Sequence, residues 1–144
     1  MILLKKFEEF IKEGTITKGR IDMQRAKNLL LESKRKMNSL AINLKKVGIK
    51  NENANDYIEY CYDILMLLLR SKLYAYGYFS NGQSAHEAVV SFAREIGFSE
   101  EKVKFLNELR YIRNGILYYG KQLDTEYAKK VVNFLKSNYS QLTP

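Results

Sequence analysis

The sequence has little of several residue types on which binding sites and architecture often depend. Its one cysteine, Cys61, has no partner for an internal disulfide, which excludes a disulfide framework and fits a reducing compartment. Its one proline is Pro144, so no helix interior is broken by proline. Its one histidine is His86, and without a second histidine no metal site of the usual His/Cys spacing is expected. We therefore expect neither a metal nor a cofactor.

Long hydrophobic runs are also missing. The longest uninterrupted apolar run covers residues 64–69, which is far shorter than a membrane-spanning helix. The N-terminal residues MILLKKFEEF do not resemble a signal peptide, because the apolar run is short and the charges follow it. We expect a cytoplasmic protein that does not associate with membranes.

Positive charge is concentrated in one segment of the chain. Residues 18–50 hold ten basic and two acidic side chains, a balance that equals the net charge of the whole protein, +8. Such a segment attracts partners that carry phosphate, although the solvated face of a helix gives the same pattern. Within it, we expect a nucleic acid to contact Lys34, Arg35 and Lys36.

Apolar residues recur at helical spacing through most of the chain, and no convincing strand alternation is present. We expect an all-α fold: an up-and-down bundle of five or six antiparallel helices in a single domain of residues 1–144, with residues 1–19 forming a short helix and its connection. Residues 53–76 are apolar over much of their circumference, which is typical of a helix at the centre of a bundle. The expected helices cover about residues 2–13, 21–46, 53–76, 84–96, 100–119 and 124–138.

Several residues predict where these helices begin and end. Ser84 and Glu87 form a Ser-x-x-Glu pattern, which is typical of a capping box at a helix N-terminus. Ser99 and Asp124 are expected to cap the next two helices. A glycine after the last turn, such as Gly48, suits the left-handed conformation that ends many helices.

Few side chains offer acid–base or nucleophilic chemistry. His86 lies just after the predicted cap at residue 84, and we expect a surface role beside that cap. A nucleophilic pair of Cys61 and His86 is conceivable, but no local signature supports it.

The stretch LRYIRNGILYYG, residues 109–120, is unusual for a helix. Arg113 falls at the edge of its apolar stripe, so it can lay its stem on the core and present its guanidinium at the boundary. With Asn114 it could bind phosphate, or it could simply pair with an acid on a neighbouring helix. Gly115 weakens the helix, which suggests a crowded contact there, although a neutral accident is an alternative.

This stretch, in the longer segment LNELRYIRNGILYYG that follows GYFSNGQSAHEAVVSFAREIGFSEE, resembles the second half of a HEPN domain (higher eukaryotes and prokaryotes nucleotide-binding). The likeness covers about residues 25–135. It implies a helical bundle that forms homodimers and binds RNA or nucleotide. Many members resemble metal-independent ribonucleases, and some are toxins silenced by a nucleotidyltransferase partner.

The resemblance also implies a site. Arg113 matches the arginine of the family's Arg-x(4–6)-His motif, and Asn114 matches the polar residue beside it. The place of the histidine is held by Tyr118 at the shortest spacing. A tyrosine, with an ordinary pKa near ~10, is a poor base at neutral pH but can donate a hydrogen bond to phosphate. On one unbroken helix, residues 113 and 118 should diverge by roughly 140°.

The predicted catalytic residues are therefore Arg113, Asn114 and Tyr118, if the site is active. Arg113 and Tyr119 join Lys34, Arg35 and Lys36 as predicted nucleic-acid contacts. The leading hypothesis is a HEPN-like RNA- or nucleotide-binding protein with a nucleotidyltransferase partner. The alternative is a non-catalytic helical scaffold or adaptor that binds other proteins.

Overall fold

The computed structural model describes residues 3–144 and confirms the all-α bundle. Met1 and Ile2, the second of which begins the first predicted helix, lie outside the described residues. The described part contains six α-helices, a short 3-10 helix and a small two-stranded sheet. The sequence pattern did not predict the sheet. The elements are α1 (Phe7–Lys12), β1 (Ile16–Lys18), α2 (Met23–Lys46), η1 (Asn51–Asn53), α3 (Ala54–Ala75), β2 (Tyr78–Ser80), α4 (Ala85–Phe92), α5 (Glu100–Tyr119) and α6 (Thr125–Leu142).

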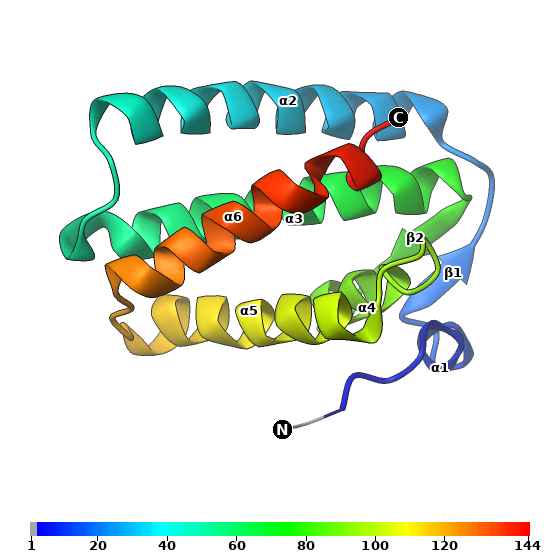
Figure 1. Cartoon of the computed structure of the whole chain (residues 1–144). Coiled ribbons are helices and arrows are strands. Elements are labelled where there is room, and N and C mark those ends of the chain that lie inside the picture. The colour runs from blue at the N-terminus through cyan, green and yellow to red at the C-terminus, as the bar shows by residue number, and fades with distance from the viewer. Residues whose placement is uncertain (1–2) are drawn as a thin grey trace.

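Helix α3 is the centre of the bundle. It packs against α2, α4, α5 and α6, and the four long helices α2, α3, α5 and α6 run in alternating directions (Figure 1). Its side chains are buried around most of the helix, including Tyr62 and Leu69, as its apolar sequence predicts. The functional consequence is that side chains of α3 can support groups on both α4 and α5.

Helix α2 buries one narrow seam and leaves the rest of its surface to solvent. Its buried residues Ala26, Ser33 and Leu40 are seven residues apart, so they lie on one side of the helix, as in helices that pack along their length. At one end of the seam, the Ser71 hydroxyl donates a hydrogen bond of 2.7 Å to the Ala26 carbonyl oxygen. The basic residues of α2 therefore remain largely outside the core.

Helix α4 begins after Ser84 as predicted, but its cap and its C-terminal end differ from the prediction. Ser84 is the N-cap residue, but its side chain accepts no cap hydrogen bond, so the expected capping box does not form. The helix also ends at Phe92 and not near residue 96. After it, the amides of Arg94 and Glu95 bond to carbonyls three residues back, at 3.2 and 2.9 Å, so the chain continues as tight turns.

Helix α5 has the predicted bounds. Ser99 Oγ accepts a hydrogen bond from the Lys102 amide at 3.3 Å, and Gly120 ends the helix with φ +62°. Asp124 caps α6 as expected, because its carboxylate accepts a bond of 2.9 Å from the Tyr127 amide, and α6 continues to Leu142, four residues beyond its predicted end. Of the first predicted helix, only Phe7–Lys12 is helical in the described residues.

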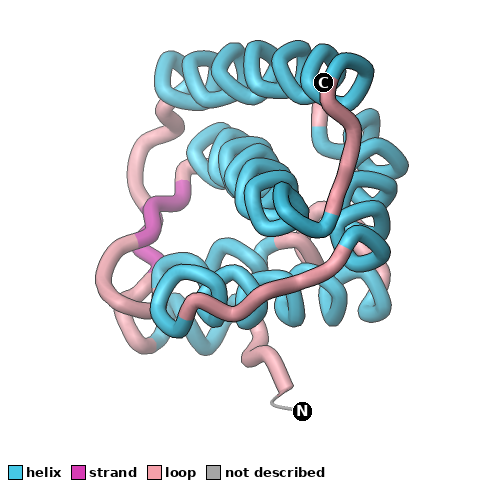
Figure 2. The backbone as a smooth tube through the Cα atoms, turned by 90° about the vertical axis from the view of Figure 1, so that its left-hand side faces the viewer, coloured by secondary structure: helices cyan, strands magenta, loops and turns pink. Residues whose placement is uncertain are grey.

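The two strands join distant parts of the chain. Strand β1 comes before α2 and β2 after α3, and they pair antiparallel with Ile16 opposite Ser80. Figure 2 shows the pair at the edge of the helical bundle. Each strand has three residues, too few for an alternation that could be recognised in the sequence.

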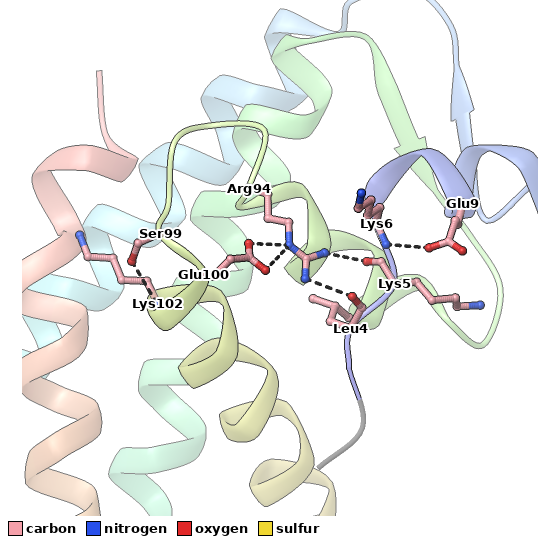
Figure 3. Close-up of polar contacts among 8 residues, drawn as sticks. All are labelled: Leu4, Lys5, Lys6, Glu9, Arg94, Ser99, Glu100 and Lys102. Carbon is pink, nitrogen blue, oxygen red and sulfur yellow. Dashed lines mark hydrogen bonds and ion pairs between the residues drawn. The ribbon is translucent and has the colours of Figure 1, made fainter.

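Arg94 ties the N-terminal segment to the bundle (Figure 3). Its guanidinium donates to the carbonyl oxygens of Lys5 and Leu4 at 2.8 and 3.1 Å, while Nε donates to the Glu100 carboxylate at 2.8 Å. These contacts use most of its donors, so we assign Arg94 a structural role.

Candidate functional site

Polar side chains of α4 and α5 enclose a cavity of about 480 Å³. Arg110, Arg113 and Asn114 are three and four residues apart, which places them on one face of α5. The wall opposite comes from the first turn of α4 and the residues before it. The cavity is lined by Gln83, Ser84, His86, Glu87, Arg110, Arg113, Asn114 and Tyr118.

Arg113 is a partly buried cation of this cavity. Its side chain is 22% exposed, and its guanidinium carbon lies 5.4 Å from the centre of the Tyr62 ring. The expected pairing with an acid on a neighbouring helix occurs only loosely, because Nη2 lies 4.0 Å from an oxygen of Asp63, beyond hydrogen-bond distance. Its Nε is buried and has no hydrogen-bond partner among residues 3–144. Nε itself is closed to a ligand, but the terminal Nη groups of this partly exposed side chain make no hydrogen bond within the same residues and remain available to a further acceptor.

Arg110 is held at a fixed angle beside Arg113. Its Nε and Nη2 both donate to the Asn107 side-chain oxygen, at 3.1 and 3.0 Å. The guanidinium also lies 4.5 Å from the centre of the Tyr111 ring. These contacts restrict its rotamers, so a second cation is positioned at the cavity before any ligand arrives.

The two predicted tyrosines take different positions. Tyr118 is 74% exposed and lines the outer part of the cavity, one turn beyond Asn114. Helix α5 is unbroken, as the predicted divergence of residues 113 and 118 requires, yet both side chains reach the same cavity because it is broad. Tyr119 is 86% exposed and is not part of the cavity wall.

His86 was expected to have a surface role beside the helix cap, but it also contacts a residue of the core. The residue is exposed overall, but its Nδ1 lies 3.1 Å from the hydroxyl oxygen of Tyr62. Tyr62 is only 1% exposed, so this contact fixes the imidazole to the core of the bundle. The sole histidine of the chain thus borders the same cavity as Arg113.

Burial and neighbouring cations set the protonation of this pair. Burial raises the pKa of Tyr62 to about 12, despite the opposing effect of Arg113 and Arg110, so its hydroxyl keeps its proton at neutral pH. Partial burial lowers the pKa of His86 below its ordinary value, and the positive charges of Arg113 and Arg70 lower it further. The imidazole is therefore neutral near pH 7.

Cys61 does not share this site. The residue is fully buried, and burial raises the pKa of its thiol to about 12, so no thiolate forms at neutral pH. The neighbouring residue Tyr62, and not Cys61, contacts His86. The structure gives no support to a nucleophilic pair of Cys61 and His86.

The basic residues of α2 lie away from the cavity. Helices α2 and α5 pack on opposite sides of α3 in Figure 1. Arg35 forms a two-pronged ion pair with Glu32, and the Lys36 ammonium lies 4.5 Å from the centre of the Tyr60 ring. The predicted nucleic-acid contacts therefore fall on two separate surfaces, with Lys34 exposed on the first and Arg113 on the second.

Gly115 is not crowded within the chain. A methyl group added there would meet only the Lys121 side chain, at 3.5 Å, which is an ordinary contact distance. The crowding expected from the sequence is thus not found among the described residues.

Sequence reasoning missed two residues of this arrangement, Tyr62 and Arg110, and it gave His86 only a surface role beside the helix cap. Arg110 could have been found, because it lies three residues before Arg113 on the same helical face. The contact between Tyr62 and His86 had no local signal, since only the packing of α4 on α3 brings the two side chains together.

Comparisons with family models, with curated proteins and with solved structures found no match for this chain. Within residues 3–144, no three His, Cys, Asp or Glu side chains gather in a way that could hold a metal ion. The helices of this described part are all too short or too polar to cross a membrane.

Proposed function

We propose that the protein is a HEPN-like, cytoplasmic homodimer that binds RNA or a nucleotide through a phosphate group in the cavity between α4 and α5. The observation that carries this proposal is the pair Arg110 and Arg113, two arginines on one helical face, of which Arg113 is only loosely paired with Asp63. A nucleotidyltransferase is the proposed protein partner, on the strength of the sequence resemblance alone.

A phosphate group supplies acceptors for the hydrogen-bond donors of this site. A guanidinium presents a planar fork of donors that matches phosphate oxygens, and Asp63 is too distant from Arg113 to satisfy that fork. Asn114 adds an amide on the same face, and the exposed Tyr118 can donate its hydroxyl proton from the outer wall. The cavity volume of about 480 Å³ lies in the range of small-molecule sites, so one nucleotide can enter.

Fluorescence anisotropy with a labelled single-stranded RNA tests the proposal. Arg113→Ala should weaken binding by about tenfold or more, since a hydrogen bond to a charged group contributes about 1.5–3 kcal/mol. Arg113→Lys should restore only part of the affinity, because it returns the charge without the fork. The matched control is Lys130→Ala on α6, which removes an equal charge from an exposed position outside the cavity. Equal losses in Arg113→Ala and Lys130→Ala would reject a specific site.

A second candidate function is the scaffold or adaptor. Its support is a group of exposed apolar and aromatic side chains towards the C-terminal end of α5, where Leu117, Tyr118 and Tyr119 are 45%, 74% and 86% exposed. Aromatic side chains of this kind are enriched in protein interfaces. A protein that binds neither RNA nor nucleotides at low salt would favour this reading over the first.

A further inference from the structure

A second cavity, of about 250 Å³, lies at the end of the bundle where α2 leads through η1 into α3 (Figure 1). It is separate from the cavity between α4 and α5, because the two have no residue in common. Its walls are two facing stripes of residues at helical spacing, one on the end of α2 and one on the start of α3. The stripe on α2 consists of Leu40, Asn43 and Val47, and the stripe on α3 consists of Asp56, Tyr57 and Tyr60.

The inner part of this cavity is apolar and aromatic. Leu40 and Tyr57 are buried, and Tyr60 is partly buried. Burial raises the pKa of Tyr57, so its hydroxyl is neutral at pH 7. The face of a tyrosine ring carries partial negative charge and attracts cations, while Leu40 offers a surface for alkyl groups. The interior therefore suits a ligand that is both positively charged and partly apolar.

Asp56 supplies the one formal charge among the described residues that line the cavity. Its carboxylate forms no ion pair within residues 3–144. Asn53, which also lines the cavity, is already engaged: its Oδ1 accepts from the Lys50 amide at 2.8 Å, and its Nδ2 donates to the Gly48 carbonyl at 3.1 Å. The site thus offers a carboxylate without an ion-pair partner in the described chain, next to two aromatic rings.

An ammonium group of the protein itself contacts one of these rings. Lys36 precedes Leu40 by about one turn of α2, and its Nζ lies 4.5 Å from the centre of the Tyr60 ring. Lys36 is not part of the cavity wall. The contact indicates that the Tyr60 ring is placed to attract an ammonium ion, and it puts a like charge near any cation that enters the cavity.

We propose that this cavity binds a small alkylammonium ion, whose nitrogen contacts Asp56 and the tyrosine rings and whose alkyl chain packs on Leu40 and Val47. An anion would meet the Asp56 carboxylate and no cation among the described lining residues. The volume suits a ligand with few non-hydrogen atoms, since sites for drug-sized molecules begin near ~300 Å³. The inference does not depend on the proposed phosphate site, so either can fail without the other.

Three probes of similar shape test the chemical class: n-butylammonium, n-butanol and n-butyrate, each titrated into the full-length ¹⁵N-labelled protein at constant ionic strength. n-Butylammonium should shift the amide NMR signals of the two facing stripes, with a Kd in roughly the millimolar range expected of so small a ligand. n-Butanol should bind about fivefold more weakly, and n-butyrate should not bind. The net charge of +8 repels cations in general, so a preference for the ammonium ion indicates a local site. Equal affinities for n-butylammonium and n-butanol would overturn the proposal.

A pair of charge substitutions locates the bound cation. Asp56→Asn keeps the shape of the side chain and removes its charge, so it should weaken n-butylammonium binding about threefold or more. The matched control Glu52→Gln on η1 removes an equal charge at the same end of the bundle but outside the cavity wall, and it should have little effect. Equal losses in the two variants would show that cations respond only to the general charge of this end, which would reject the site.

Substitutions of Tyr60 and Lys36 test the aromatic contact. Tyr60→Phe should keep most of the affinity, whereas Tyr60→Leu should lose about threefold or more because the aromatic face is removed. Lys36→Met should tighten binding by about threefold, since it removes the competing ammonium group from the Tyr60 ring. Equal affinities in the two Tyr60 variants, or binding that Lys36→Met leaves unchanged or weakens, would contradict the assigned position of the ligand.

The wild-type titration decides the proposal as a whole. Saturable shifts confined to the two facing stripes support it. The lack of any saturable shift, even at n-butylammonium concentrations well above the millimolar range, would overturn it whatever the protein does with RNA. Circular dichroism of each variant confirms that a loss of binding is not due to unfolding.

Discussion

At the scale of single residues, Tyr62 determines what the other side chains of the cavity can do. Its hydroxyl holds His86, and its ring supports Arg113, so two groups from different helices depend on one residue of α3. Arg113 could be predicted from the local sequence because it falls at the edge of the apolar stripe of α5, and Asn114 because the residue beside that arginine is polar in the family motif. Tyr62 could not, because an apolar central helix with several tyrosines gives no sign of which one meets the cavity.

The titration of His86 provides a direct prediction. In the free protein, its NMR-measured pKa should lie below the ordinary value of about 6.5, and Arg113→Ala should raise it by removing a nearby positive charge. The unfolded chain binds a proton at His86 more tightly than the folded protein does. The contribution of His86 to stability is therefore fully present at pH values above the ordinary pKa of histidine. Stability should fall as the pH drops through the folded-state pKa. An unchanged pKa in Arg113→Ala would contradict the assigned proximity of the two side chains, and Lys130→Ala should have no effect.

At the scale of elements, the two serine caps predicted from the sequence differ in whether a cap hydrogen bond forms. Ser99 accepts such a bond at the start of α5, whereas Ser84 makes none at the start of α4. We expect Ser99→Ala to lower the free energy of unfolding by about 1 kcal/mol. The matched variant Ser84→Ala should change it by no more than about 0.5 kcal/mol. Urea denaturation of both variants measures the difference, and equal losses would indicate that Ser84 forms a cap in solution.

Gly115 offers a second test on α5. Because an added methyl group meets only ordinary contacts, Gly115→Ala should raise the free energy of unfolding by up to about 1 kcal/mol. Sedimentation of the same variant reports on the proposed homodimer. A protein that is more stable but no longer dimeric would place Gly115 in the interface. A destabilised monomer would show that the helix tolerates no side chain there.

The sequence predicted the helices well because most of them have a buried stripe and a recognisable end. The bounds of α5 were predicted fully, since a capping serine and a terminal glycine flank a regular stripe. The predicted end of α4 was wrong because apolar residues continue beyond Phe92 into the turns that follow, so the apolar pattern extends past the end of the helix. The strands were missed because three residues pair only when α2 and α3 have brought them together.

At the scale of the whole molecule, the positive charge is divided between two surfaces. The basic side chains of α2 lie across α3 from the cavity, so one compact nucleotide cannot touch both surfaces of a protomer. A longer RNA that passes around the bundle, or a dimer that brings the surfaces of two copies together, could contact both.

This separation predicts independent contributions to RNA binding. Lys34→Ala and Arg113→Ala should each weaken binding to a long RNA, and the double variant should lose the sum of the two free energies within about 0.5 kcal/mol. Each substitution should also reduce the dependence of affinity on salt concentration. With one phosphate contact fewer, RNA binding releases fewer counterions. For a single nucleotide, Lys34→Ala should have no effect. Strong non-additivity in the long RNA would show that the two surfaces form one site.

The strand pair also affects how the chain closes on itself. Ile16 and Ser80 are far apart along the chain, and joining them in an unfolded polymer would cost the entropy of a long loop. The antiparallel hairpin of α2 and α3 brings the start of α2 and the end of α3 to the same end of the bundle, and the amide of Asp22 bonds there to the Tyr74 carbonyl at 3.1 Å. Once that hairpin exists, only the short segments between the helices and the strands remain free to move. Closing this shorter loop costs about 2 kcal/mol less entropy than closing the long loop of the unfolded chain. We therefore expect the strands to pair after the hairpin of α2 and α3 has formed.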